Sequence, residues 1–346
     1  MKGSETMKRI VSMAAVLAFV FSGLNPLLSV AAAASDHVFR IAALPPKGGT
    51  YMNAMDAFAA EIKEKSGGAV SFRFYPGGSM GDEKDYIKRM RVNLDGAVFS
   101  AMGLGDIIPQ VRVLEAPFIF DSYEEAAYVR DKVTPSLVKL FAEKGYTVLG
   151  WAEQGRVYIW STNSPIADVD ELKQHKCWVW AGGPLAASVY EVAGVTPIAL
   201  SPVDVLTSLQ TGIVDTIYCS ANILIQLEWY SKIKYMTDFP LLYAIGATIV
   251  KKDKFEGMPP ELQDLTKEVF ERHMDDLVRN TRTENAEALE ILKNKMKVEA
   301  VPVAAERADA FYAAGNEVRK RNLGKLWDQP ILDEVMAALE EYRAKK

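Results

Sequence analysis

The chain has 346 residues and a formal net charge of −5, from 40 basic and 45 acidic side chains. A net negative charge without a basic block is not typical of nucleic-acid-binding proteins, so we expect no nucleic-acid partner. The length exceeds what one hydrophobic core usually holds, which predicts two lobes.

The N-terminus has the pattern of a secretory signal peptide. Two lysines and an arginine within the first nine residues precede an apolar run over residues 10–21, and small residues follow at Ala31–Ala34. This order predicts that residues 1–34 are cleaved off and that the mature protein is exported. The alternative is an uncleaved anchor, which the shortness of the apolar run disfavours.

Strand and helix patterns alternate along the first 161 residues. Apolar residues at a spacing of two predict strands, and those at a spacing of three or four predict helices. Ser122 and Glu125 also match the S-x-x-E capping box, which predicts a helix start. The predicted strands are 37–44, 69–75, 96–101, 146–152 and 157–161, and the predicted helices are 51–65, a segment with residues 86–90, 122–129 and 135–144.

Residues 176–222 carry the pattern on which the predicted binding site depends. Strands and helices alternate with short connections, which is typical of an α/β unit with a parallel sheet. Ser201 is the predicted N-cap of its second helix. Ligands of such sheets bind at the carboxyl ends of the strands, here 178–183 and 218–222. The predicted strands are 176–180, 196–200 and 213–219, and the predicted helices are 185–192 and 202 to about 212.

The C-terminal part of the chain is predicted to be largely helical. Pro259 and Pro260 precede apolar residues at helical spacing as far as Leu292, which indicates one long bent helix or two in succession. A mixed-charge amphipathic helix is predicted at Asp333–Arg343.

The two cysteines, Cys177 and Cys219, both fall on predicted strands. Export to an oxidising compartment permits a disulfide if these strands lie side by side. The alternative is two buried thiols that pack as small apolar residues. The sequence leaves both interpretations open, because geometry decides between them.

The sequence lacks the usual signatures of an enzyme. His37, His175 and His273 show no metal-site spacing, and the chain has no C-x-x-C, no G-x-S-x-G and no nucleotide-binding glycine pattern. We therefore expect no enzymatic activity, no metal and no cofactor.

Several segments resemble the solute-binding proteins of TRAP (tripartite ATP-independent periplasmic) transporters. They are G-S-M-G-D-E-K at 78–84, L-E-A-P-F-I-F at 114–120 and the more specific L-Q-T-G-I-V-D at 209–215. The resemblance covers nearly the whole mature chain and implies a two-lobed α/β periplasmic binding protein fold with a ligand cleft between the lobes. It also implies a small-molecule solute and membrane permease subunits as partners.

The resemblance further implies that the chain crosses between the lobes more than once. The expected first lobe is 35–155 plus about 245–285, and the expected second lobe is about 156–244 plus 286–346, with long helices near the C-terminus.

One position departs from the family pattern. Most members carry an arginine that grips the solute carboxylate, and the matching residue here is Trp178. An indole offers one N–H and a broad apolar face where a guanidinium offers paired donors and a fixed charge. The departure favours an apolar, aromatic or amphipathic solute. The alternative is a carboxylate held by Arg156, although a one-residue offset in a strand places a side chain on the opposite face unless a bulge intervenes.

Aromatic residues gather near the predicted site in same-face pairs, Trp178 with Trp180 and Tyr158 with Trp160. We expect them to wall the cleft, and the alternative is that they pack the sheet against its helices. The candidate ligand-binding residues are Trp178, Trp180, Gly182, Gly183, Tyr218, Ser220, Asn222, Gln154, Tyr158, Trp160, Arg156, Met102 and Met80. The leading hypothesis is a TRAP solute receptor; a sensor subunit and an envelope lipid carrier are the alternatives.

Overall fold

The computed structural model describes residues 36–345. The predicted signal peptide and its cleavage point lie outside the described residues. Within residues 36–345, no helix combines the length and the apolar character that crossing a membrane requires.

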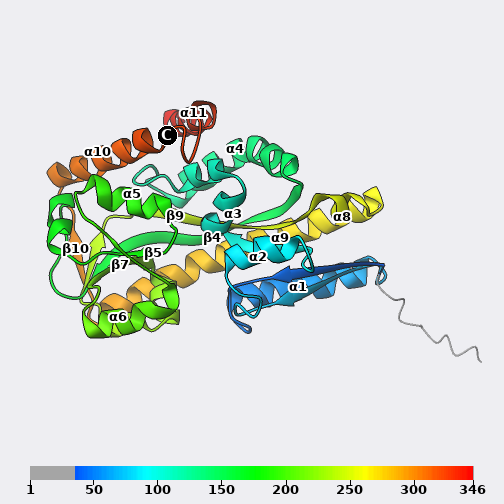
Figure 1. Ribbon diagram of the computed structural model, residues 1–346, viewed down its shortest axis with the longest axis horizontal. Coiled ribbons are helices and arrows are strands. Elements are labelled where there is room, and N and C mark those ends of the chain that lie inside the picture. The colour runs from blue at the N-terminus through cyan, green and yellow to red at the C-terminus, as the bar shows by residue number, and fades with distance from the viewer. Residues whose placement is uncertain (1–35, 346) are drawn as a thin grey trace, which may run out of the picture. The chain divides into compact units, whose positions relative to one another are not determined.

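The centre of the structure is one mixed sheet of eight strands (Figure 1). In chain order the strands are β1 (His37–Ala42), β2 (Val70–Tyr75), β3 (Gly96–Ser100), β4 (Tyr146–Ser161), β7 (Thr216–Ser220), β8 (Tyr235–Asp238), β9 (Leu242–Lys251) and β10 (Glu299–Pro302). They lie in the order β10-β8-β4-β9-β3-β1-β2, and β7 pairs with β4. Strand β1 pairs in parallel with both β2 and β3, as the α/β pattern of the first third predicts.

Strand β4 is continuous through the segment where the sequence pattern predicted a break between two strands. Its pairing with β9 shifts register between Glu153 and Gly155, where a β-bulge accommodates an extra residue. Gly155 has a φ of +102°, which a residue with a side chain rarely adopts. The prediction of two separate strands is therefore wrong, and one bulged strand of 16 residues replaces them.

Residues 176–222 fold as an α/β unit whose strands are divided between two sheets. Strands β5 (Trp178–Trp180) and β6 (Ile198–Leu200) form a separate two-stranded parallel sheet. The third strand of the unit, β7, instead pairs antiparallel with β4. An isolated parallel bridge between Cys177 and Thr216 still places β5 beside β7.

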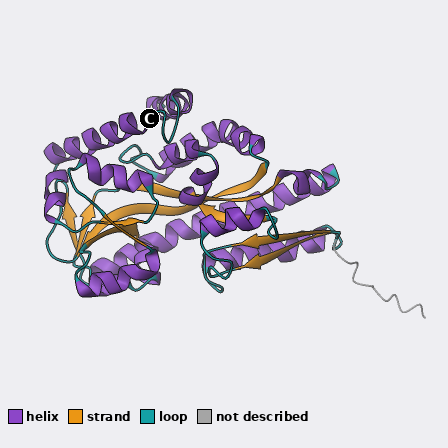
Figure 2. Cartoon of the chain, viewed as in Figure 1, coloured by secondary structure: helices purple, strands orange, loops and turns teal. Residues whose placement is uncertain are grey.

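Helices lie on both sides of the sheet (Figure 2). In chain order the α-helices are α1 (Thr50–Lys65), α2 (Glu83–Met90), α3 (Ala101–Ile107), α4 (Tyr123–Glu143), α5 (Pro184–Val192), α6 (Val205–Thr211), α7 (Ala221–Gln226), α8 (Lys252–Glu256), α9 (Pro260–Glu290), α10 (Ala305–Asn322) and α11 (Gln329–Ala344). Short 3-10 helices are found at Pro109–Glu115, Val169–Gln174, Pro202–Asp204 and Trp229–Ser231. Helix α9, yellow to orange in Figure 1, contacts β4, α1 and α7, so it packs against both halves of the chain.

Helix α4 is more continuous than the sequence pattern indicated, and α9 decides between two predictions that the sequence left open. Helix α4 runs through Pro135, where two segments were predicted. Helix α9 has 31 residues and continues as a π-helical turn at Ile291–Lys295, so the interpretation as one long helix is confirmed. The Ser122 hydroxyl accepts the Glu125 N–H at 3.1 Å, which confirms the predicted start of α4. Ser201 makes no side-chain capping bond, and a 3-10 turn precedes α6.

The two cysteines are free thiols buried in different parts of the core. Cys177 packs in the cluster that contains Tyr190. Cys219 packs in a second cluster with Trp160 and Trp229. Burial raises the pKa of the Cys177 thiol to about 12. Of the two interpretations that the sequence left open, the structure has the buried thiols.

Candidate functional site

A cavity of about 410 Å³ lies where the sequence places the binding site. Residues of β3, β4, β5, β7 and β9 line it, together with the first turns of α1, α5 and α7. Both predicted strand ends contribute. The predicted site residues in its lining are Gln154, Met102, Trp178, Trp180, Gly183, Tyr218, Ser220 and Asn222.

One wall of the cavity is aromatic. The Trp178 ring stacks on Tyr218, with centroids 5.1 Å apart and planes at 26°. Trp229 meets the same indole edge to face at 5.5 Å. Trp178 Nε1 donates to the Leu200 carbonyl at 3.1 Å, so its only N–H is already used. Trp178 therefore presents an apolar surface to a solute, and its 3% exposure shows that the ring is held in place by packing.

Two glycines allow the loop after β5 to approach the opposite side of the cavity. At Gly183 an added Cβ would lie 3.2 Å from Met102 Cε. Gly182 has a φ of +88°, and an added Cβ there would lie 2.5 Å from Lys84 Nζ. Gly182 lies outside the cavity lining, and its backbone conformation needs glycine.

The polar side chains of the cavity lining differ in how many of their hydrogen-bonding groups already have a protein partner. Asn222 Nδ2 donates to Glu284 at 2.9 Å, and the Asn222 backbone N–H donates to the Asn285 side chain at 3.2 Å. The Tyr218 hydroxyl accepts the Trp180 N–H at 3.4 Å. The Ser220 hydroxyl has no hydrogen-bond partner among the described residues, although Ser220 is only 2% exposed. Ser220 is therefore available to a solute.

A buried carboxylate, Glu83, is part of the cavity lining. Its oxygens accept the Ser100 N–H at 2.8 Å, the Ser100 hydroxyl at 2.9 Å and the Gly103 N–H at 2.7 Å. Burial raises the pKa of Glu83 to about 7, against the lowering effect of these hydrogen bonds. The Asp106 charge raises the Glu83 pKa further.

A second carboxylate in the lining is Glu115. It accepts the Ile245 N–H at 2.9 Å. Burial raises the pKa of Glu115 to about 7, the Arg112 guanidinium lowers it and Glu83 raises it. Burial raises the pKa of Tyr218, and the charge of Glu115 raises it further.

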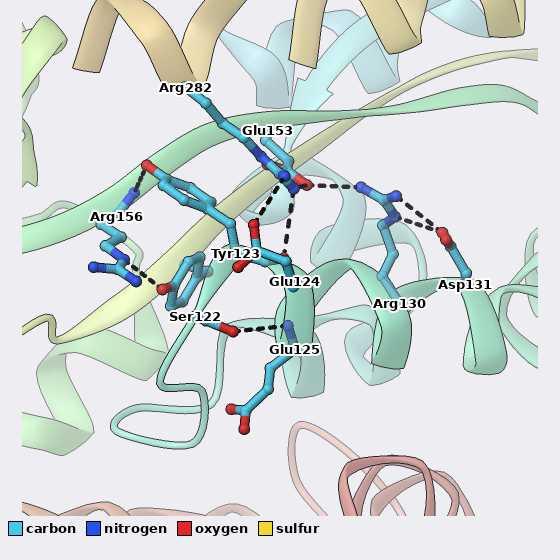
Figure 3. Close-up of polar contacts among 10 residues, drawn as sticks. Ser122, Tyr123, Glu124, Glu125, Arg130, Asp131, Glu153, Arg156 and Arg282 are labelled. Atoms are coloured by element: carbon cyan, nitrogen blue, oxygen red, sulfur yellow. Dashed lines mark hydrogen bonds and ion pairs between the residues drawn. The ribbon is translucent and has the colours of Figure 1, made fainter. Parts of the chain in front are cut away.

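The charges of two further lining residues are neutralised by the protein itself. The Arg112 guanidinium donates to Asp106 at 2.8 Å, to the Met102 carbonyl at 3.1 Å and to the Gly105 carbonyl. Glu153 accepts from Arg282 Nε and Nη2, both at 2.8 Å, and from Arg130 Nη1 at 3.0 Å (Figure 3). Neither Arg112 nor Glu153 offers an unbalanced charge to a solute.

Arg156 lies outside the cavity lining, in a cluster with aromatic rings (Figure 3). Its guanidinium donates to the Asp121 carbonyl at 3.0 Å and to the Tyr243 hydroxyl. It also sits 5.2 Å from the Tyr123 ring centroid and 5.5 Å from that of Tyr243. The bulge before Gly155 does not turn this side chain into the cavity. These contacts give the arginine a structural role.

Three other predicted residues also lie outside the lining. Tyr158 and Trp160 are 5% and 0% exposed and form an edge-to-face pair at 6.0 Å. Trp160 Nε1 donates to the Cys219 carbonyl at 2.9 Å. This is the packing role that the sequence left as the alternative for the pair. Met80 packs against the core as a partly buried residue.

Sequence reasoning missed the acidic part of the site. Glu83 and Glu115 stand inside G-S-M-G-D-E-K and L-E-A-P-F-I-F, which served only as family markers. The sequence offered two signals for them. Glu83 is an acidic residue at the first helical position of α2, and Glu115 is an acidic residue between apolar residues in a buried segment. Trp229 and Glu284 carried no comparable signal in the sequence.

The family model described as bacterial extracellular solute-binding protein, family 7, matches residues 41–325. A curated relative, a solute-binding protein of Chromohalobacter salexigens, is 29% identical over 214 residues, which cover 61% of this chain and 63% of the relative. The match therefore spans less than two thirds of that relative's length.

Two solved structures share the fold. A TRAP periplasmic solute binding protein from Ochrobactrum anthropi, with its C-terminus bound in the ligand binding pocket, is 22% identical. Its TM-score is 0.82, over 90% of this chain and 97% of that one. A TRAP periplasmic solute binding protein from a Sulfitobacter species, with bound β-D-galacturonate, is 22% identical with a TM-score of 0.77, over 88% and 99% of the two chains. These likenesses confirm the two-lobed α/β fold.

Proposed function

This chain belongs to the bacterial extracellular solute-binding proteins of family 7, and we propose that it is the periplasmic receptor of a TRAP-type transporter. The cavity carries this proposal, because it draws its lining from both expected lobes. The family is one of solute receptors and not of enzymes. The proposed partners are a small-molecule solute and the membrane permease subunits that receive it.

The aromatic wall supports a solute with an apolar or aromatic body. Burial of each 100 Å² of apolar solute surface contributes about 2.5 kcal/mol before the losses of binding. The Sulfitobacter neighbour binds a sugar acid, which makes a carboxylate solute the competing class. Against it, Trp178 has no free N–H, Arg112 is already paired and Arg156 lies outside the lining.

The expected crossings between the lobes meet at one place, which supports a hinge there. Glu153 pairs with Ile245 across β4 and β9, beside the bulge at Gly155. Asn285 Nδ2 donates to the Gln154 carbonyl at 3.1 Å. All three proposed boundaries, near residues 155, 245 and 285, therefore lie together. We propose that closure of the lobes over the solute bends the chain at this point.

Native mass spectrometry and a ligand panel test the receptor proposal. The purified mature protein is first analysed for a co-purified small molecule. Its melting temperature is then measured with benzyl alcohol and indole, against succinate and D-galacturonate, because a ligand that binds only the folded state raises that temperature. We expect a bound small molecule, or shifts with the aromatic probes that Trp178→Ala abolishes and Arg156→Ala leaves unchanged.

Two results contradict the proposal at different levels. If neither a co-purified molecule nor any shift is found, the chain is not a receptor for solutes of these classes. If succinate or galacturonate binds tightly and Arg156→Ala removes that binding, the receptor stands and the apolar solute class is wrong.

A further inference from the structure

The cavity lining holds three carboxyl groups that no basic side chain of the described residues pairs with. Three carboxylates of the lining, Glu83, Glu115 and Glu284, accept hydrogen bonds from neutral donors, namely backbone N–H groups, hydroxyls and an amide. No ion pair joins any of the three to a basic side chain within residues 36–345. The one guanidinium of the lining, Arg112, is already paired with Asp106.

The aromatic wall faces the same space and favours the same sign of charge. The stacked Trp178 and Tyr218 rings and the Trp229 ring lie within one cluster. The faces of aromatic rings carry negative electrostatic potential and attract cations, most strongly when both partners are desolvated. Glu115 and Tyr218 both line this cavity, so the carboxyl group and the ring faces border the same space.

A further polar group of this region has no protein partner among the described residues. The Ser220 hydroxyl lines the cavity, is 2% exposed and has no hydrogen-bond partner within the described residues. A buried hydroxyl without a partner is destabilising unless a ligand or water meets it. Ser220 is on β7, two residues after Tyr218, so both side chains lie on the same face of that strand.

We propose that the solute is an organic cation, an apolar or aromatic body that carries a primary or quaternary ammonium group. Glu115 and the Trp178–Tyr218 rings hold the ammonium, and the rest of the aromatic wall covers the apolar body. This inference rests on the proposed receptor function and specifies its solute class. A carboxylate solute would instead lie beside three carboxyl groups, with no unpaired basic side chain among the described residues of the lining, which is unfavourable where water is largely displaced.

A metal ion is not the cation that this geometry fits. No group of three or more histidine, cysteine, aspartate or glutamate side chains within residues 36–345 is arranged to hold a metal. A hard divalent cation needs several oxygen ligands around one point, whereas aromatic faces suit a weakly hydrated organic ammonium.

Four probes of similar size test the sign of the preferred charge. Isothermal titration at pH 8 compares benzyltrimethylammonium and benzylamine with benzyl alcohol and benzoate. We expect both cations to bind at least about 10-fold more tightly than benzyl alcohol, and benzoate to bind most weakly. Glu115→Gln keeps the acceptor for the Ile245 N–H. It should lower the affinity for the two cations about 10-fold and change the affinity for benzyl alcohol less than about 2-fold.

Glu271→Gln is the matched control, because this carboxylate is exposed on α9 and lies outside the cavity lining. It should leave all four affinities unchanged. If Glu115→Gln fails to fold, Glu284→Gln provides a second test of whether a lining carboxylate favours cations, with a smaller expected loss of cation affinity. Benzoate or benzyl alcohol binding as tightly as the cations would overturn the proposal, as would unchanged cation affinity in Glu115→Gln.

The failure of this inference is distinguishable from failure of the receptor function. Loss of the cation preference while benzyl alcohol still binds overturns the solute class alone. Absence of binding by all four probes also overturns the solute class, and the co-purified molecule then decides the receptor function separately.

Discussion

Replacement of Arg156 by alanine should lower stability and leave solute binding intact. The half-buried guanidinium donates to the Asp121 carbonyl and the Tyr243 hydroxyl and lies over two tyrosine rings. Hydrogen bonds to a charged group contribute about 1.5–3 kcal/mol each, and exposed cation–π contacts about 0.5–1 kcal/mol. Because solvent reaches the group, we expect Arg156→Ala to reduce the free energy of unfolding by about 1–3 kcal/mol in total.

The assay for Arg156→Ala is a paired measurement. Urea denaturation gives the free energy of unfolding, and isothermal titration gives the affinity for the tightest-binding ligand of the panel. Arg73→Ala is the control, because this exposed arginine lies 5.2 Å from the Tyr75 ring centroid and outside the lining. A loss of solute affinity of about 10-fold or more in Arg156→Ala, beyond that in Arg73→Ala, would refute the assignment of a structural role.

Three further changes have defined outcomes. Trp178→Ala should lower the free energy of unfolding by about 3–5 kcal/mol and abolish binding of aromatic ligands, whereas Trp178→Phe should keep most of that binding. Equal affinity for aromatic ligands in the wild type and both variants would contradict the role of the aromatic wall. Benzyltrimethylammonium should bind more tightly as pH rises from 6 to 8, because Glu83 and Glu115, with pKa values raised to about 7, must lose protons to pair with it; a flat titration contradicts this. Gly155→Ala should destabilise by about 1–3 kcal/mol, since its Cβ would lie 2.5 Å from Asn285 Nδ2; wild-type stability would contradict the strained position.

Glu83 and Glu115 also make the free energy of unfolding depend on pH, and here the rise in pH is unfavourable, whereas it favours cation binding. Their pKa values are raised in the folded protein relative to the unfolded chain, so the folded state binds protons more tightly. Their contribution to stability is present at low pH and is lost as pH rises from about 4.5 to about 7. In Glu115→Gln the free energy of unfolding should depend less on pH across this window, and an unchanged slope would show that Glu115 titrates normally.

Local spacing predicted the elements near the site well, because each depends on residues close together in sequence. Ser122 and Glu125 are three residues apart, and the capping bond between them forms as expected. The strand ends at Trp178 and Tyr218 both reach the cavity because the carboxyl ends of adjacent parallel strands meet at one edge.

The remaining features depend on contacts that spacing does not encode. A bulge in β4 decides on which face of the strand Arg156 lies. The position of this bulge depends on the pairing of β4 with β9, which is far along the chain. Glu83 and Glu115 belong to separate segments, and only the tertiary fold brings both into the same lining. Burial of the Tyr158 and Trp160 pair follows from packing against β7 and its flanking helices, which the alternation within one strand could not show.

The mass and charge of the molecule that leaves the purified receptor on mild unfolding test the central claim most directly. The structure predicts a compound small enough for a cavity of about 410 Å³, with an aromatic or aliphatic body and an ammonium group. Release of a dicarboxylate or a sugar acid that carries no positive charge would contradict it.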